Sequence, residues 1–255
     1  MLNSTLHSPP AAAWAPAVAL HDVRKVYGRG EGAIAALDGV SVVLAAGSFT
    51  AVMGPSGSGK STFLNVAAGL DRPTSGTVRL GEMDLAQLSE RRLTILRRER
   101  IGFVFQAFNL LPSLTVAQNI ALPLRLDGRR TRRSTVREVA ARVGLETRLR
   151  HRPAQLSGGQ QQRVAIARAL VTRPEVRFAD EPTGALDTRT GHDVLALLRE
   201  IVDHDRHTVV MVTHDPVAAA YADRVILLAD GRLAGTLVAP SADEVAEQLA
   251  HLGGS

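Results

Sequence analysis

The stretch Gly54–Thr62, GPSGSGKST, fits the pattern G-x-x-x-x-G-K-[ST] of a phosphate-binding loop. The apolar segment 49–53 before it has the length of a buried strand, and segment 63–68 after it is typical of a helix. Strand, glycine-rich loop and helix in this order are the context in which the motif is specific. The stretch therefore predicts a site for the phosphates of a nucleotide.

Each residue type in this loop suits a densely charged phosphate group. Glycines allow positive φ and keep side chains away from the phosphate oxygens, so that backbone N–H groups and a helix N-terminus can face them. Lys60 would reach the β- and γ-phosphates, and the Ser61 hydroxyl could ligate Mg²⁺. Lys60 is one of two lysines among 30 basic residues, and a compact ammonium suits this position better than a planar guanidinium. We predict nucleotide binding through Gly54, Pro55, Ser56, Gly57, Ser58, Gly59, Lys60, Ser61 and Thr62.

Composition places the chain among ordinary globular proteins. Its 255 residues are 45% hydrophobic and 22% charged, which fits one large domain or a domain with a subdomain. The formal net charge of +5 is compatible with nucleic-acid binding. However, the basic residues are spread out except in 91–100 and in the arginine run 129–133, and few aromatic residues are available to stack on bases. We predict no nucleic-acid partner and interpret the arginine runs as solvated surface, with an anionic membrane or an acidic partner as the alternative.

Three features of the sequence bear on the cellular compartment of the protein. The chain has no cysteine, which agrees with a reducing cytoplasm and leaves no thiol chemistry. It contains no run of about 18 apolar residues, so no membrane-spanning helix is expected. Segment 11–20 is apolar but lacks a basic leader and contains Pro16, so we expect no signal peptide.

The order of apolar and polar segments predicts an α/β fold. Continuous apolar strands alternate with amphipathic helices after the loop, which is typical of a mainly parallel sheet. Before the loop, segments 18–26 and 34–44 resemble antiparallel strands, with a turn at 37–40 inside the second. Segment 107–152 has helical patterns and few strand signals. The predicted organisation is a disordered N-terminal tail over 1–17, a nucleotide-binding domain over 18–238 with an inserted helical subdomain at 107–152, and a C-terminal helix and tail over 239–255.

A pair of acidic residues, Asp180 and Glu181, follows the apolar strand that begins at Val176. Carboxylates at a strand end on the same sheet edge as Lys60 and Ser61 are the usual way to hold Mg²⁺ at bound phosphates. Because adjacent strand residues point to opposite faces, the two acids can take separate roles. We expect Asp180 to organise the metal and Glu181 to polarise the attacking water. Arg177 lies within this strand, and we expect its head to reach an edge or a partner.

The string Leu156–Gln160, LSGGQ, opens a helix with the same anion-binding features as the loop. A hydroxyl at Ser157 and bare backbone at Gly158 and Gly159 meet a helix N-terminus. A plain helix cap would look the same. Together with the loop and Asp180-Glu181, however, the chain closely resembles the ATP-binding-cassette (ABC) ATPases, whose motifs occur in this order up to His214. The resemblance covers about residues 18–238 and implies a P-loop NTPase fold: a RecA-like core with a mainly parallel sheet, an antiparallel β subdomain and an inserted helical subdomain.

The resemblance implies roles for residues that spacing alone does not assign. Tyr27 would stack on the adenine of ATP. Gln106 would touch Mg²⁺ and the nucleophilic water and would sense a membrane partner, and His214 would contact the γ-phosphate. The implied catalytic residues are Glu181, His214 and Gln106, and the implied metal ligands are Ser61, Gln106 and Asp180.

The resemblance also implies a partner, which is a second copy of the chain. Ser157 and Gly159, within the string Ser157, Gly158, Gly159 and Gln160, would bind the γ-phosphate of ATP held on the other subunit. Asp187 would link the two sites of this head-to-tail dimer, and ATP-driven dimerisation would power a separate permease.

Finer features resemble the macrolide-export and lipoprotein-release subgroup. These are the glycine insertion after Tyr27, the run 101–112 and the sequence LSGGQQQRVAIARA at 156–169. This resemblance implies an exporter ATPase placed on the inner face of the plasma membrane. The string Ala67-Ala68-Gly69 and Arg177 depart from the subgroup's usual residues, away from the predicted chemistry.

The sequence leaves two alternative functions to consider. A non-transport ABC ATPase would act as a regulatory or mechanical module, but a second cassette and a long coiled-coil insertion are both lacking. A regulatory GTPase would need an Asn-Lys-x-Asp string to read guanine, and the chain has none. The transported substrate and the identity of the permease cannot be read from this chain, because the membrane subunit selects the substrate.

Overall fold

The computed structural model describes residues 16–128 and 131–253. The N-terminal part forms an antiparallel sheet in the strand order β2-β1-β4-β5. Its strands are β1 (Pro16–Tyr27), β2 (Ile34–Ala45), β4 (Ser75–Leu80) and β5 (Met83–Asp84). Alternating apolar residues of β1 such as Val18 and Leu20 are buried, so one face of this sheet packs on the rest of the molecule.

The central sheet has six strands in the order β10-β9-β3-β8-β7-β6. Its neighbouring strands are parallel except at one edge, where β9 and β10 are antiparallel. Strands β3 and β8 are buried along their whole length, as expected for a parallel sheet covered on both faces. This architecture confirms the predicted α/β fold class. The strands are β3 (Phe49–Met53), β6 (Ile101–Phe105), β7 (Val176–Asp180), β8 (Thr208–Val212), β9 (Arg224–Ala229) and β10 (Arg232–Val238).

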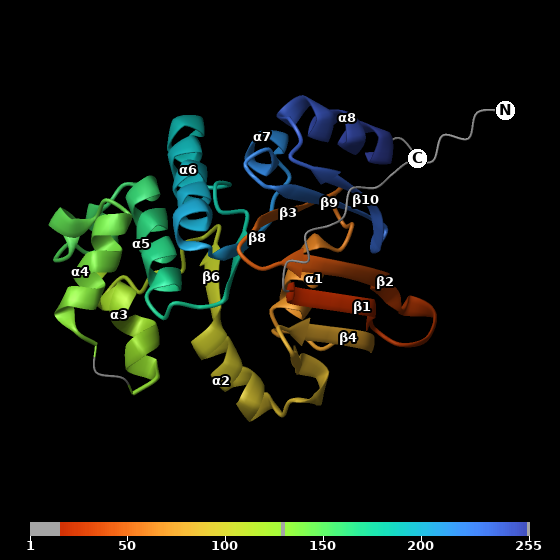
Figure 1. Cartoon of the computed structure of the whole chain (residues 1–255), viewed down its shortest axis with the longest axis horizontal. Helices are drawn as coiled ribbons and strands as arrows, with labels where there is room; N and C mark the ends of the chain where they lie inside the picture. The colour runs from red at the N-terminus through yellow and green to blue at the C-terminus, as the bar shows by residue number, and fades with distance from the viewer. Residues whose placement is uncertain (1–15, 129–130, 254–255) are drawn as a thin grey trace.

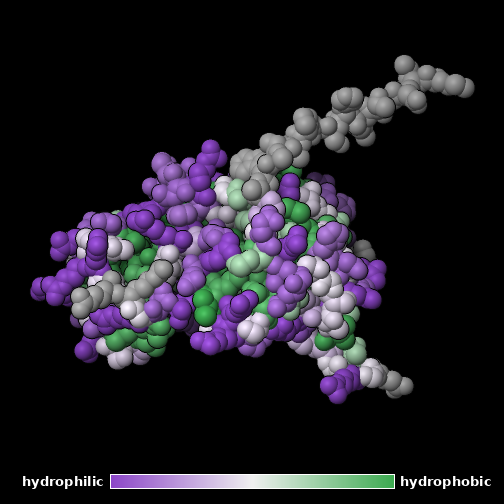
Figure 2. Space-filling model, turned by 60° about the horizontal axis from the view of Figure 1, so that its bottom comes forward, coloured by the Kyte–Doolittle hydropathy of each residue, from purple (hydrophilic) through white to green (hydrophobic). Residues whose placement is uncertain are grey.

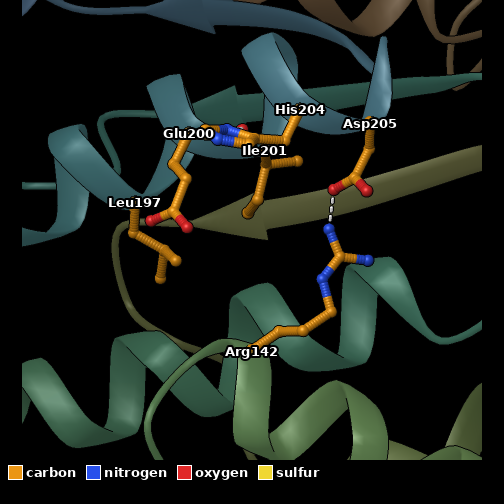
Figure 3. A pocket seen from close by; sticks show the side chains of 6 residues that line it. All are labelled: Arg142, Leu197, Glu200, Ile201, His204 and Asp205. Atoms are coloured by element: carbon orange, nitrogen blue, oxygen red, sulfur yellow. Dashed lines mark hydrogen bonds and ion pairs between the residues drawn. The ribbon is translucent and has the colours of Figure 1, made fainter.

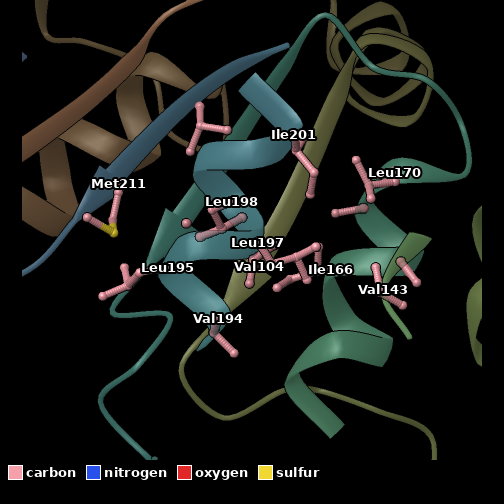
Figure 4. Packing of buried hydrophobic residues seen from close by; sticks show 14 of the residues in the cluster. Val104, Val143, Ile166, Leu170, Val194, Leu195, Leu197, Leu198, Ile201 and Met211 are labelled. Atoms are coloured by element: carbon pink, nitrogen blue, oxygen red, sulfur yellow. The ribbon is translucent and has the colours of Figure 1, made fainter. Parts of the chain in front are cut away.

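Helices cover both faces of the central sheet (Figure 1). α1 and α2 share one apolar cluster with the antiparallel sheet, while α3, α4, α5 and α6 share the other. In the second cluster, Ile201 of α6 points toward Leu170 of α5 (Figure 4). The α-helices are α1 (Lys60–Ala67), α2 (Glu90–Arg100), α3 (Val116–Leu126), α4 (Arg133–Arg142), α5 (Gly158–Leu170), α6 (Thr188–Asp205), α7 (Pro216–Ala219) and α8 (Ala242–Gly253), with short 3₁₀ turns η1 (Gly30–Gly32), η2 (Leu85–Gln87), η3 (Glu146–Arg148) and η4 (Pro153–Gln155).

The predicted boundaries need two corrections. Residues 1–15 of the predicted tail lie outside the described residues, but Pro16 and Ala17 already belong to β1. The turn expected at 37–40 is wrong, because β2 runs through it with a register shift and Gly39 at φ 75°. The predicted helical unit at 107–152 contains α3 and α4, and these two helices pack against α5. α8, in the predicted C-terminal segment, packs on α7 and β9.

Among the described residues, ion pairs join the helical unit to the rest of the molecule at two places. Arg98 of α2 pairs with Asp127 at the end of α3, 2.7 Å apart. Arg142 at the end of α4 pairs with Asp205 at the end of α6. Both residues line a cavity of about 160 Å³, as does Glu200 (Figure 3). Among residues 16–128 and 131–253, no helix is long and apolar enough to cross a bilayer.

Arg177 does not reach an edge or a partner, so that expectation is wrong. It lies in β7 between Gly102 of β6 and Val209 of β8, and it is 1% exposed. No described residue accepts a hydrogen bond from its guanidinium. Burial, and to a lesser degree the charge of Arg142, lowers the pKa of Arg177 to about 9.

Candidate active site

The loop between β3 and α1 lies at the carboxyl end of a buried parallel strand. Its glycines differ in what surrounds them. A Cβ atom on Gly54 would lie 2.0 Å from the Leu228 carbonyl oxygen, and one on Gly59 would lie 2.2 Å from the Ala36 carbonyl oxygen. A Cβ atom on Gly57, at φ 81°, would meet nothing within 4 Å. Gly54 and Gly59 are thus required by packing against β9 and β2, and Gly57 by its backbone conformation on the open side.

Lys60 lies at the first turn of α1 and turns back into the loop. Its ammonium donates hydrogen bonds to the carbonyl oxygens of Gly54 and Pro55, both at 2.8 Å. Burial lowers its pKa, and the nearby charges of Glu181 and Asp180 oppose that change. The cation therefore sits over the loop with two carboxylates close by, where it can exchange its carbonyl partners for phosphate oxygens.

Asp180 and Glu181 lie at the carboxyl end of β7, beside the end of β3 across β8. Burial raises the pKa of Asp180, the charge of Glu181 adds to this effect, and Lys60 opposes it. The backbone of Glu181 is left-handed at φ 46°, an uncommon conformation for this residue type. A strained residue at a strand end re-aims its side chain, and here the Glu181 carboxylate turns toward β8.

Two residues that follow β8 hold the Glu181 carboxylate. His214 Nδ1 lies 2.7 Å from Glu181 Oε1, and the Thr213 hydroxyl donates to Oε2 at 3.3 Å. The His214 side chain is 74% exposed, whereas that of Glu181 is 18% exposed. Lys60, Asp180, Glu181 and His214 are therefore brought together at one sheet edge from positions spread over 154 residues of sequence (214 − 60).

Gln106 follows β6 and lies on the exposed side of the same edge. A Cβ atom on Gly184 would lie 2.8 Å from Gln106 Nε2, so the loop after Glu181 contacts the Gln106 amide. Sequence reasoning missed Gln162, a fully buried residue of α5 that donates to the Pro182 carbonyl oxygen at 2.5 Å. A polar residue among the apolar positions of a buried helix is the signal that would have found it. Gln162 fixes the position of the loop that follows Glu181.

Tyr27 at the end of β1 lies beside the last residue of the loop. Its hydroxyl donates to Asp71 at 2.8 Å, and the Lys25 ammonium lies 4.9 Å from its ring centroid. Burial and the Asp71 hydrogen bond raise the pKa of Tyr27, while a hydrogen bond with Thr62 opposes the rise. Tyr27 remains 42% exposed, so its side chain is accessible to a ligand next to the loop.

The string 157–160 lies apart from these residues. Ser157 caps α5 in a capping box with Gln160, and α5 packs on the opposite face of the central sheet from α1. Gly159 fits against α6, since a Cβ atom there would lie 2.2 Å from Thr190 Cγ2. Asp187 caps α6 and accepts from the Thr190 N–H at 3.0 Å. No hydrogen bond or ion pair of the described residues joins 157–160 to 54–62, so the chain does not close this string over its own loop.

A groove of about 470 Å³ runs between the helical unit and the rest of the molecule. Figure 2 shows its hydrophobic floor, to which Phe103 and Phe105 contribute. Arg168 of α5 lies in its wall and donates to the carbonyl oxygens of Phe108 and Asn109, two residues with left-handed backbone. The loop after Gln106 is thereby held in place at the groove.

The residues around Lys60 suit a magnesium–nucleotide complex. The Ser61 hydroxyl, the Asp180 carboxylate and the Gln106 amide supply hard oxygen ligands. The raised pKa of Asp180 indicates a carboxylate that a nearby cation would stabilise. Among the described residues, no group of three or more His, Asp or Glu is placed to hold a metal by itself. The metal would therefore need phosphate oxygens and waters to complete its coordination, as Mg²⁺ does at nucleotide sites.

Comparisons with known proteins agree with this geometry. The family model described as "ABC transporter" matches residues 37–184. The chain is 46% identical over 216 residues to the uncharacterized ABC transporter ATP-binding protein YvrO of Bacillus subtilis, covering 84% of this chain and 94% of that protein. It is 48% identical over 220 residues to the macrolide export ATP-binding/permease protein MacB of Shigella flexneri, covering 86% of this chain. The chain spans only 34% of the length of that relative.

A solved structure has the same fold. The dimeric ATP-binding cassette MJ0796, in a post-hydrolysis state bound to ADP and phosphate, superposes with a TM-score of 0.79 at 44% identity, covering 88% of this chain and 99% of that chain. The family match spans more than half of the chain and includes the loop and the acidic strand end. This chain therefore belongs to the ABC transporter family.

Proposed function

We propose that this chain is the ATPase subunit of a membrane transporter, that it works as a head-to-tail dimer, and that it drives export by a separate permease. One observation carries the proposal. The loop 54–62 gathers Lys60, Asp180 and Glu181 around it, whereas Ser157–Gln160 face away on the other side of the sheet. A second anion-binding helix end that is unused within the chain suits the γ-phosphate held by another copy.

Within each site, we assign distinct roles to the residues of this chain. The loop and Lys60 hold the phosphates, and Tyr27 contacts the adenine. Ser61, Asp180 and Gln106 would hold Mg²⁺, which neutralises phosphate charge when bound. Glu181 orients the attacking water and accepts its proton, with His214 holding the carboxylate and reaching the γ-phosphate.

The dimer converts nucleotide binding into movement. Ser157, Gly158, Gly159 and Gln160 of one copy face the loop of its partner, and Asp187 lies at the junction. A nucleotide that contacts both copies binds the closed dimer better than the open one, so it shifts the equilibrium towards closure. Hydrolysis weakens that bridge. The dimeric state of the solved cassette MJ0796 supports this arrangement.

The groove beside Gln106 is where we place the permease. Its apolar floor and polar rim fit an inserted helix or loop, and the Gln106 loop connects this groove to the site. The names of relatives such as MacB, which combine ATP-binding and permease functions in macrolide export, support a membrane partner and an outward direction. The chain would then lie on the cytoplasmic face of the membrane.

The Glu181→Gln variant tests the catalytic assignment. Without the carboxylate, ATP turnover should fall by at least about 10²-fold, while ATP binding persists because the loop is intact. Added ATP should then convert the variant to a stable dimer, measured by light scattering after size-exclusion chromatography. Glu138→Gln, at an exposed position of α4, is the matched control and should keep parental turnover. Parental turnover in Glu181→Gln would contradict the role of Glu181, and a variant that stays monomeric with ATP would contradict the dimer.

A further inference from the structure

A basic surface with an exposed leucine lies where α3 ends and α4 begins. We define this α3–α4 tip as Arg125, Leu126, Arg132 and Arg133. All four are exposed, and Leu126 is 69% exposed. No described residue forms an ion pair with its three arginines. Arg129 and Arg130 lie outside the described residues, so the tip is defined without them.

The two helix ends of the tip are held close together. Three peptide steps separate Gly128 from Thr131, a span of at most about 11 Å, and α3 packs against α4. The tip also borders the groove, because Pro123 of α3 lines it. Arg98, another groove residue, pairs with Asp127 next to Leu126. The tip therefore continues the rim of the groove in which we place the permease.

The residue types of the tip restrict which kind of partner it can bind. Asp127 is the one acidic residue between Arg125 and Arg133 in the sequence, and its charge is matched by Arg98. Three unmatched arginines favour an anionic partner, and the aliphatic side chain of Leu126 favours one with an apolar layer beneath its charges. Leucine has no π-face on which a nucleic-acid base could stack. A membrane with anionic headgroups presents both features, and arginine stems can lie along its apolar boundary.

We propose that the α3–α4 tip contacts anionic phospholipid headgroups beside the permease, with its three arginines on lipid phosphates and Leu126 among the headgroups. This proposal rests on the proposed function, because a cassette seated on its permease through the groove turns this rim towards the bilayer. Each arginine near an anionic surface is worth about fivefold in membrane partitioning, so three are worth about a hundredfold. The interaction should weaken as salt increases.

Vesicle sedimentation of the full chain tests the proposal. The probes are phosphatidylcholine vesicles with and without one third phosphatidylglycerol. We expect the parent chain to prefer the anionic vesicles, and R125Q/R132Q/R133Q to lose up to about a hundredfold of that partitioning. The control R79Q/R206Q/R224Q removes the same charge from exposed positions outside the tip and should retain it. Leu126→Ser should weaken binding without changing the net charge.

Several outcomes would overturn the proposal: no preference for anionic vesicles, an equal loss in the control, or tighter binding of the tip to single-stranded RNA than to the vesicles. Basal ATP hydrolysis of the tip variants should match that of the parent, because the tip lies outside the active site. If only the lipid-binding proposal is wrong, the chain should not bind the vesicles, while its permease still stimulates its ATP hydrolysis. If the proposed function is wrong, the chain should still bind the vesicles, but no permease should stimulate its ATP hydrolysis.

Discussion

Glu181 and Arg177 lie four residues apart along the chain and show two opposite ways to place a charge. The Glu181 carboxylate leaves the sheet at the strand end and finds His214 and Thr213. The Arg177 guanidinium is buried, and no described residue accepts a hydrogen bond from it. Burying an unpaired charge is costly, so the fold carries a local destabilisation at Arg177 that its chemistry does not require.

Replacing Arg177 with methionine should therefore stabilise the fold. The methionine side chain would fill similar space without a buried charge, and we expect the free energy of unfolding to rise by about 1–3 kcal/mol. Urea denaturation at neutral pH measures it. The exposed Arg173→Met change is the control and should alter stability by less than about 0.5 kcal/mol. A lower urea midpoint in Arg177→Met would show that the guanidinium has a stabilising partner.

The lowered pKa of Arg177 has its own signature at alkaline pH. Above the folded pKa of about 9, the unfolded chain holds more protons than the folded chain, so stability should rise with pH. Below pH 9 the destabilisation is complete. Arg177→Met should remove this component of the rise, as measured by urea midpoints at about pH 8 and about pH 10.

His207 should make the fold acid-sensitive. Burial, and then the charges of Arg177 and Arg142, lowers the pKa of His207 from 6.5 to about 4. Between these values the unfolded chain binds the proton more readily, so stability is lost as pH falls from 6.5 towards 4. Because solvent screens a half-buried ring, the loss should be about 1–2 kcal/mol. His207→Gln should reduce the drop in urea midpoint, whereas the exposed neighbour His204→Gln should leave it; equal drops in parent and His207→Gln would contradict this.

At the scale of elements, the shape of the loop depends on two other strands as well as on its own sequence. The carbonyl oxygen of Leu228 in β9 occupies the space next to Gly54, and that of Ala36 in β2 occupies the space next to Gly59. The antiparallel sheet thus reaches the active site through β2. The glycines of this motif are usually explained by the close approach of phosphate to the backbone. Here Gly54 and Gly59 are also required because the backbone of neighbouring strands packs against them.

Two glycine variants separate these causes. Gly59→Ala combines φ 96° with a Cβ atom 2.2 Å from a backbone oxygen, so it should cost at least about 3 kcal/mol of stability. Gly57→Ala meets open space and only the cost of positive φ, about 1 kcal/mol. Thermal unfolding without nucleotide compares the two directly. Equal costs would show that backbone conformation alone requires these glycines.

At the scale of the whole molecule, the central sheet separates the two anion-binding helix ends. α1 begins at the loop on one face, and α5 begins at Ser157 on the other. In the proposed dimer, a single chain would hold two halves of different sites. Two copies arranged head to tail would complete both, which is the symmetry of a closed two-fold dimer.

Mixing two inactive variants tests this arrangement. Lys60→Ala disables the loop 54–62, and Ser157→Arg blocks the string 157–160. Each homodimer should therefore lack ATP hydrolysis. In a mixed dimer one site has both mutations and the other has neither, so mixing should restore up to about a quarter of the parental rate. ATPase assays over a range of mixing ratios measure it. No recovery in mixtures that are shown to form mixed dimers would mean that Ser157 does not act across the dimer.

The sequence by itself determined the fold class, the phosphate loop and the order of the motifs, because strand–glycine–helix patterns and apolar periodicity are local. It also pointed to Asp180-Glu181 through their place after an apolar strand, and the resemblance to the ABC ATPases added His214; the structure brings these side chains together with Lys60. It could not place Gln162 or Arg177, since a buried polar group is defined by neighbours from distant strands and helices. The β2 turn was wrong for the same reason: pairing with β1 absorbs Gly39 as an irregularity in a continuous strand. Only the tertiary structure decided that Ser157 and Lys60 lie on opposite faces of the sheet, because this depends on how parallel strands order themselves in space.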